Sequence, residues 1–258
     1  MPPMDDDSGL RGWHRAAVGS PGTSSKRAVV RGRLAVGALA SFVAVVLTAC
    51  SSDEPPSPPP SGALLRAATR GDAGDVERLL ARGADPDETD QDGRTAVTHA
   101  AYGGHAEVVR LLVDAGADVN RQDATRANAL LSTGETGFVR VLGEVLRAEP
   151  DLTRTNRFGG TALIPAADRG HVEVVRRLLQ TDVDVDHVND LGWTALLEAV
   201  ILGDGGPAHV EIVRLLLEAG ADPAIADGEG ITPLEHARNA GYDAMVELLT
   251  QADVQGRG

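Results

Sequence analysis

The feature that most constrains this chain of 258 residues is an internal repeat with a period of 33. Glycines that each precede a helix-forming stretch recur at Gly71, Gly104, Gly137 and Gly170. Threonines ahead of another helical stretch keep the same spacing, at Thr95, Thr161, Thr194 and Thr232. The last threonine step is 38 because five extra residues, 204–208, lie within it. A repeat of this length predicts a solenoid of stacked helical units.

An apolar stripe runs along the second helical stretch of each unit. Counted from the opening glycine, the fifth position holds Val76, Val109, Leu142, Val175 and Val246, and the eighth holds Leu79, Leu112, Val145, Leu178 and Leu249. Val213 and Leu216 join the stripe once the insertion is removed. Residues three apart share one face of a helix. One helix pair cannot bury such a stripe alone, so we expect neighbouring units to bury it together.

Two phrases carry a family resemblance: "GRTAVTHAAYGGHAEVVRLLVDAGADVN" at 93–120 and "GITPLEHA" at 230–237. With the period, they resemble the ankyrin repeat and its T-P-L-H-x-A signature, although no unit keeps the signature histidine. The resemblance covers about 62–254 and implies an all-α ankyrin-repeat solenoid of about six helix-turn-helix units with short β-hairpin turns. The expected units are 62–92, 93–125, 126–158, 159–191, 192–229 with the insertion, and 230–254, before a tail at 255–258.

Local residues indicate where the helices begin and end. We expect first helices to be capped by Thr95, Thr161, Thr194 and Thr232, and by Asn128 in the third unit. Gly83, Gly116 and Gly220 are expected to end second helices in left-handed geometry. Glu149 and Asp182 stand at that place in units three and four, where left-handed geometry costs a non-glycine residue about 1 kcal/mol. Arg126 replaces a turn glycine. Units three and four are therefore expected to open most easily among the inner units.

The N-terminal part has the pattern of an export signal. Residues 34–50 hold "LAVGALASFVAVVLTAC", and Lys26, Arg27, Arg31 and Arg33 precede it within the basic, disordered region expected at 1–33. The uncharged run of 16 residues is short of the roughly 20 that span a bilayer, and is typical of a secretory signal. Its end, "LTAC", resembles the lipobox of bacterial lipoproteins, which implies lipidation of Cys50 at a new N-terminus.

Cys50 is the only cysteine, so no internal disulfide can form. An accidental thiol and an uncleaved signal anchor are the alternatives to lipid attachment. A diacyl anchor would hold firmly, and the Pro-rich tether at 51–61 would extend by about 3 Å per residue. We expect an exported protein, lipid-anchored to the outer face of the cell membrane or in the periplasm of a bacterium.

The charge of the remaining chain is strongly negative. Of 24 Lys and Arg and 38 Asp and Glu, the first 50 residues hold six and three, which leaves 18 against 35. No lysine follows Lys26. This charge argues against nucleic acid and anionic membranes as partners. Solubility and codon bias explain much of this charge better than a dedicated basic partner does.

Candidate chemistry is sparse, and we expect no enzyme, no metal and no cofactor. The calcium-like run "DVDVDHVND" at 182–190 has His187 and Trp193 where a calcium loop needs glycine and glutamate. His105, His171 and His209 occupy a place that in ankyrin repeats bonds backbone. His99 and His236 lie on first helices with no evident acid or nucleophile partner, so no catalytic set is indicated.

What remains is a surface for a protein partner. The resemblance implies that hairpin tips and the exposed side of first helices bind, at Arg94, His99, Tyr102, Arg157, Phe158, Leu191, Trp193, Glu198 and Ile201. Exposed aromatic residues commonly anchor interfaces. Trp193 has an alternative role as a lid over its neighbour's hairpin. The insertion is expected to lengthen the turn between two helices, as a second contact or a tolerated loop.

These observations predict a membrane-tethered, extracytoplasmic protein–protein interaction module that is monomeric and non-catalytic. Two other classes remain open: an accessory or protective subunit of an envelope redox enzyme, and an immunity protein that binds a basic toxin.

Overall fold

The computed structural model describes residues 59–256. The expected signal, the lipobox with Cys50 and most of the tether lie outside these residues. The described part forms six helix pairs, one in each expected unit: α1 (Ala63–Arg70) with α2 (Ala73–Ala81), α3 (Ala96–Tyr102) with α4 (Ala106–Asp114), α5 (Ala129–Thr136) with α6 (Val139–Leu146), α7 (Leu163–Asp168) with α8 (Val172–Leu178), α9 (Ala195–Ile201) with α10 (Pro207–Glu218), and α11 (Pro233–Ala240) with α12 (Asp243–Gly256).

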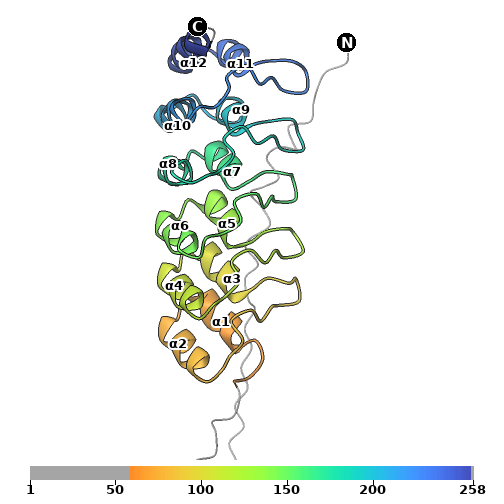
Figure 1. The fold of residues 1–258 in the computed structure, drawn as a ribbon, viewed down its shortest axis with the longest axis vertical. Coiled ribbons are helices and arrows are strands. Elements are labelled where there is room, and N and C mark those ends of the chain that lie inside the picture. Colours follow the sequence, from red (N-terminus) through yellow and green to blue (C-terminus); the bar gives the residue numbers. More distant parts are fainter. Residues whose placement is uncertain (1–58, 257–258) are drawn as a thin grey trace, which may run out of the picture. The chain divides into compact units, whose positions relative to one another are not determined.

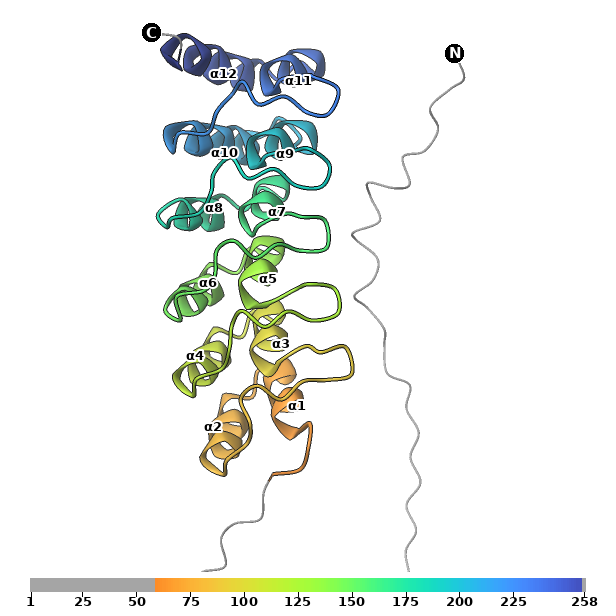
Figure 2. The same ribbon diagram turned by 45° about the vertical axis from the view of Figure 1, so that its right-hand side comes forward.

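The pairs stack into a two-layered array (Figure 1). First helices pack on first helices and second helices on second helices, while the loops between pairs project beyond the first-helix layer, as Figure 2 also shows. The all-α solenoid is thus confirmed. α12 continues past residue 254, the expected end of the last unit. Between 59 and 256 no helix combines the length and apolar character that crossing a membrane requires.

The projecting loops differ from the expected short β-hairpins. Within the described residues the loops contain no strand, and only one isolated antiparallel bridge joins Thr89 to Thr95. Side chains, described below, accept the backbone N–H groups that a ladder would otherwise pair. We keep the word hairpin for these loops, at 85–94, 118–127, 151–160, 184–193 and 222–231, and number them one to five.

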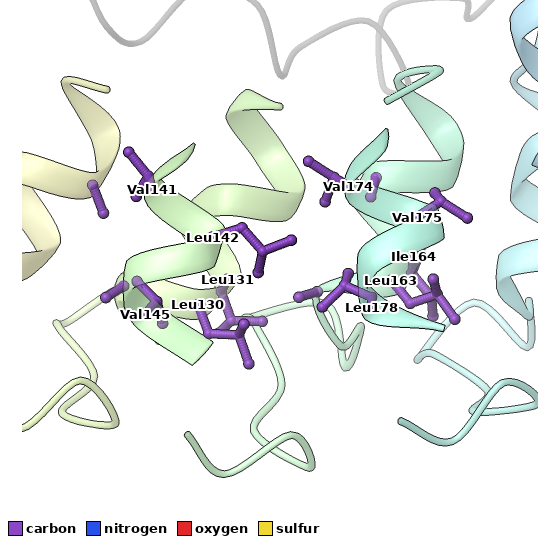
Figure 3. Close-up of a cluster of buried hydrophobic side chains, with 14 of the residues drawn as sticks. Leu130, Leu131, Val141, Leu142, Val145, Leu163, Ile164, Val174, Val175 and Leu178 are labelled. Carbon is purple, nitrogen blue, oxygen red and sulfur yellow. The ribbon is translucent and has the colours of Figure 1, made fainter. Parts of the chain in front are cut away.

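The apolar stripe on the second helices forms the core. Every stripe residue predicted at the fifth and eighth positions is buried, apart from Val246, which is partly buried. Figure 3 shows Leu142 and Val145 of α6 near Leu130 of the first-helix layer. It also shows Val175 of α8, which belongs to the next unit. Because each buried Val or Leu side chain contributes about 1.5–3 kcal/mol, stacking supplies most of the stability of the array.

The fourth position after the opening glycine also belongs to the core, which the sequence analysis missed. It holds Val108, Val141, Val174, Ile212 and Met245, all buried. The first unit, which has no unit before it, carries Asp75 there. The last unit, with none after it, leaves its fifth-position valine partly exposed. The two ends therefore indicate that the fourth position faces the preceding unit and the fifth faces the following one.

A ring from each unit lies over a glycine of the unit before it. A Cβ on Gly71 would lie 2.5 Å from Nδ1 of His105, and a Cβ on Gly137 would lie 2.6 Å from Nδ1 of His171. Nε2 of His105, His171 and His209 bonds the carbonyl oxygen of Thr69, Glu135 and Asp168 at 3.2, 3.3 and 2.9 Å. The expected backbone bonds of these three histidines are confirmed, and the packing explains why the opening residue is glycine.

Most predicted helix caps are present. Thr95, Asn128, Thr194 and Thr232 each accept a backbone N–H from the residue three positions on. The prediction for Thr161 is wrong, since its buried hydroxyl has no hydrogen-bond partner and α7 begins only at Leu163. Pro165 is the third residue of α7 and restricts the backbone of Ile164, whose N–H the predicted cap would have bonded, whereas the proline of α11, Pro233, is the first residue of its helix.

Left-handed residues at the helix ends follow the prediction in unit three and depart from it in unit four. Glu149 has φ 48° and Arg126 has φ 61°, and these are the positive values found at non-glycine residues in the described chain. Asp182, expected to be left-handed, is not among them. Helix α8 ends at Leu178, and the hydroxyl and N–H of Thr181 bond the Leu178 carbonyl instead of the usual glycine turn. Strain is therefore confined to unit three.

The insertion is packed rather than free. Pro207 and Ala208 belong to the first turn of α10, so the insertion lengthens a helix to 12 residues instead of only widening the turn. The hydroxyl of Tyr242 donates to the carbonyl oxygen of Gly203 at 3.0 Å, and a Cβ on Gly205 would lie 2.4 Å from the Tyr242 ring. The inserted segment thus forms part of the contact between the last two units, because Gly205 packs against the Tyr242 ring.

We predict that Glu149→Gly stabilises the array by about 1 kcal/mol, because glycine adopts left-handed geometry without a Cβ penalty. Urea denaturation measures the change, and hydrogen exchange should show slower opening of unit three. Asp182→Gly is the matched control, and it should not stabilise, because φ is not positive there. Equal stabilisation by both substitutions would show that the strain at Glu149 is not the cause.

Candidate functional site

Each hairpin is built around one Asp or Asn side chain. The residues are Asp90, Asp123, Asn156, Asn189 and Asp227. In every case Oδ1 accepts the backbone N–H groups of the residues two and four positions later, at 2.8–3.0 Å. These five residues keep the repeat spacing, five positions before each predicted helix cap, so the signal was available in the sequence but not recognised. The arrangement fixes the backbone of each hairpin tip.

Two histidines connect hairpins to first helices. Nε2 of His99 lies 2.7 Å from Oδ2 of Asp90, and Nε2 of His236 lies 2.7 Å from Oδ2 of Asp227. The expectation that these histidines lack an acid partner is wrong, because the acid stands nine residues earlier on the loop. No hydrogen bond within 59–256 joins either imidazole to a hydroxyl or thiol. Each pair therefore fastens a hairpin to a first helix, and neither pair has the arrangement of a catalytic group.

Hydrogen bonds, more than burial, determine the pKa of the Asp227 carboxyl group and favour its ionised form. The N–H of Ile231 and the imidazole of His236 lower the pKa of its carboxyl group below the ordinary value. An ionised Asp accepts from a histidine donor, whereas the fourth hairpin has Asn189 in the same place. The helix residue facing Asn189 is accordingly an acceptor, Glu198, whose Oε1 receives the Asn189 amide at 2.8 Å. The fourth hairpin is thus fastened to its helix by the same kind of hydrogen bond, with the donor on the hairpin and the acceptor on the helix.

Glu198 was expected on the exposed side of its helix, and this prediction is wrong. The residue is only 6% exposed, because the hairpin lies over it. Burial raises the pKa of its carboxyl group to about 7, and the nearby negative charge of Asp168 raises it as well. Through Asn189, Glu198 holds the backbone of Leu191 and Trp193, so it supports the surface without forming part of it.

The three N-terminal candidates bond mainly to their own chain. The Arg94 guanidinium lies 2.7 Å from Oδ2 of Asp123 and 5.1 Å from the centre of the Tyr102 ring. The Tyr102 hydroxyl donates to Glu135 at 2.8 Å. Burial raises the pKa of the Tyr102 phenol, and the negative charge of Glu135 raises it further. With His99 held by Asp90 of the first hairpin, this group joins units one, two and three and offers few free polar atoms.

The central candidates are brought together at adjacent hairpin tips. The N–H of Asp190 donates to the Phe158 carbonyl at 3.0 Å, which ties hairpin four to hairpin three. The Arg157 guanidinium lies 4.7 Å from the centre of the Phe158 ring. Leu191 is 51% exposed beside them. Trp193 and Ile201 are partly exposed.

Val188 was missed by the sequence analysis. It is 46% exposed on hairpin four. The corresponding places in hairpins one to three hold Thr89, Gln122 and Thr155. A valine among polar residues at an equivalent place was the available signal.

The face formed by second helices has a different character. Most of its arginines are ion-paired, within a helix or between units. Arg147 bonds Asp114 at 2.9 Å and Arg176 bonds Glu211 at 2.8 Å, each across a unit boundary. Exposed pairs of this kind contribute little stability individually. They do leave this face with its opposite charges already matched.

The described residues hold no group of three or more side chains suited to a metal ion. His187, which stands in the calcium-like run, instead places Nε2 2.7 Å from the Gly159 carbonyl oxygen. Its neighbour Asp184 accepts the N–H of Asp186. The run thus serves the contact between hairpins three and four.

Comparisons with known proteins agree with this architecture. A family model described as ankyrin repeats in three copies matches residues 64–144 and 132–227. A crystallised ankyrin repeat domain from Acinetobacter baumannii AYE is 45% identical with a TM-score of 0.73, over 75% of this chain and 99% of that domain. The ankyrin repeat protein EF0377 is 39% identical with a TM-score of 0.72, over 75% and 98% of the two chains. The putative ankyrin repeat protein YahD of Escherichia coli (strain K12) is 49% identical over 55 residues, which span 21% of this chain and 27% of YahD.

We predict a pH dependence of stability that comes from Glu198. Its carboxyl group has an ordinary pKa of 4.5 and a folded pKa of about 7, so its contribution is complete below about 4.5 and is lost as pH rises through 7. Glu198→Gln should remove this change, which is on the order of 3 kcal/mol. The Gln variant should therefore match the wild type near pH 5 and exceed it near pH 8.

Urea midpoints at both pH values measure this difference. Glu77→Gln, which removes an exposed carboxylate from α2, is the control for loss of one charge. If the wild type and the Glu198→Gln variant lose stability equally between the two pH values, Glu198 is not the titrating group.

Proposed function

This chain belongs to the ankyrin-repeat family, whose arrays are protein–protein interaction modules, and we propose that it binds another protein through its hairpin side. The proposed contact, which we call the central hairpin surface, consists of Arg157, Phe158, Leu191, Trp193 and Ile201. The observation that carries the proposal is the exposure of Leu191 beside Phe158 at two hairpin tips joined by a hydrogen bond. Apolar anchors with charged neighbours are typical of protein interfaces.

The tips are also rigid in a way that favours binding. Asn189 fixes the backbone of Leu191 and Trp193, and Glu198 fixes Asn189 in turn. Ordering a loop at the moment of binding reduces affinity, and a loop that is already ordered avoids this loss. Arg94, His99 and Tyr102 are less suited to be the main contact, because their polar atoms already have partners.

We further propose that the protein is monomeric and exported, with a lipid on Cys50 at the outer face of the membrane or in the periplasm of a bacterium. Support comes from the basic region, the apolar run and "LTAC" in residues 26–50. The similar proteins from Escherichia coli and Acinetobacter baumannii are in keeping with a bacterial origin.

We predict that Trp193→Ala weakens partner binding by about 2 kcal/mol or more, with little change in melting temperature, as truncation of an interface anchor does. Capture from an envelope extract on the wild-type chain and on the variant, followed by titration with the captured protein, measures the loss. Val254→Ala, which truncates an exposed residue on the last helix, is the control.

A fall in melting temperature without a separate loss of affinity would assign Trp193 the role of a lid over its neighbour. The identity of the captured protein separates the classes of function. A redox enzyme would indicate an accessory subunit, and a basic toxin would indicate an immunity protein.

We predict that mass spectrometry of the protein made in a bacterial host finds an acylated N-terminal Cys50. The Cys50→Ala variant should no longer be found in the membrane fraction, because the lipid anchor cannot form. Cys50→Ser tests the same point with a side chain of nearly the same size. A mature chain that begins elsewhere and carries a free thiol would contradict the lipid anchor.

A further inference from the structure

The charges on the hairpin side are segregated along the array. All five hairpin arginines lie in the first three hairpins, at Arg94, Arg121, Arg126, Arg154 and Arg157. Between residues 178 and 237 the chain has 12 Asp and Glu and one arginine, Arg214. Arg214 lies on α10, a second helix, where it bonds Glu211 and Glu218. Hairpins four and five therefore carry carboxylates without any arginine or lysine.

Two of these carboxylates stand beside the apolar anchor. Asp190 precedes Leu191 in hairpin four and is exposed, and Glu229 is exposed in hairpin five. The hairpins touch at their tips, since a Cβ on Gly192 would lie 3.6 Å from the Gly228 nitrogen. Leu191 is thus bordered along its own loop by Asp190 and across the contact by the residue after Gly228.

Neither carboxylate has an ion pair within the described residues. Most arginines of the second helices bond carboxylates of their own layer, as Arg147 and Arg176 do, and Arg157 at the border lies over Phe158. The carboxylates of Asp90 and Asp227 support hairpins through histidines, whereas Asp190 and Glu229 accept no such bond. Their charge is available to a partner.

We propose that the surface formed by Val188, Asp190, Leu191, Trp193 and Glu229 binds a polypeptide segment in which an apolar side chain is flanked by lysine or arginine. This rests on the proposed function and names the chemistry of the partner at an adjoining surface, which shares Leu191 and Trp193 with the central hairpin surface. The apolar side chain covers Val188 and Leu191, which are 46% and 51% exposed, and the flanking cations face Asp190 and Glu229. Opposite charges at the rim of an interface raise the association rate and select the partner.

The same charges oppose other occupants. A nucleic acid or an anionic membrane presents phosphates, which the two carboxylates repel. An apolar partner without cations would leave Asp190 and Glu229 desolvated and unpaired at the edge of the contact, which disfavours it. A second copy of this chain could offer the arginines of hairpins two and three, and the test below separates that case.

The test uses the fluorescence of Trp193 in the full chain with Trp13→Phe, which leaves Trp193 as the only tryptophan. The probes are two synthetic peptides that share leucine anchors and differ only in having lysine or glutamate beside them. The lysine peptide should bind and change the Trp193 emission, and the glutamate peptide should not. Raising the salt concentration should weaken binding, since exposed charges are screened beyond about 10 Å at 0.1 M.

The double variant Asp190→Asn/Glu229→Gln should weaken binding of the lysine peptide about tenfold at low salt and much less at high salt, as expected for two exposed ion pairs. Glu77→Gln/Glu247→Gln removes the same charge from second helices of the two end units and should leave the affinity unchanged. Equal binding of both peptides, or equal weakening by both double variants, would overturn the proposal, because the attraction would then be general.

Failure of the basic-segment proposal can be distinguished from failure of the proposed protein-binding function. Capture of an envelope protein that is lost with Trp193→Ala but unaffected by Asp190→Asn/Glu229→Gln would keep the protein-binding function and overturn the basic-segment chemistry. Analytical ultracentrifugation without peptide would reveal self-association. A dimer that dissociates in the Asp190→Asn/Glu229→Gln variant would also overturn the proposal, in favour of a second copy as occupant.

Discussion

Every feature of this protein depends on the burial of second-helix side chains between neighbouring units. A single unit offers three such positions, as Val174, Val175 and Leu178 do on α8, and it cannot cover them itself. The fourth position packs on the unit before and the fifth on the unit after, so each unit is completed by both neighbours. Rings such as His171 over Gly137 add a fixed polar contact to the same boundary. Stability is therefore a sum of local boundaries, and the hairpins take their places from the stack.

The hairpins in turn are shaped by side-chain hydrogen bonds rather than by β pairing. One Asp or Asn closes each loop, and in three units a helix residue fastens that side chain from below. Asp with His and Asn with Glu satisfy the same geometry with donor and acceptor exchanged, as at Asp227 with His236 and Asn189 with Glu198. This design keeps the tips rigid while leaving their outward side chains free to vary. A binding surface can thus be changed without changing the fold, because the residues that bind and the residues that shape the loop are different.

The array is also uneven along its length. Unit three contains both left-handed non-glycine residues, Glu149 and Arg126, and unit four ends its second helix by another route. Among the hairpins, arginine is confined to the first three, and apolar exposure is greatest on the fourth, at Leu191. In a solenoid with only local boundaries such differences stay where they arise. The middle of the array can therefore carry strain while the proposed partner surface lies mainly on the fourth and fifth hairpins.

The sequence alone determined the period, the all-α solenoid, most of the core stripe, four of the five predicted caps and the backbone bonds of His105, His171 and His209. These features repeat at 33 residues, and a repeat is visible without coordinates. The tertiary structure alone decided that Glu198 is buried, that His99 meets Asp90, and that Gly205 of the insertion packs against the Tyr242 ring. Each of these depends on how a loop folds over a helix or onto the next unit. The Asp or Asn of each hairpin does recur with the period, but the helix residue that faces it differs in type from unit to unit, so the repeat alone does not show which of these contacts form.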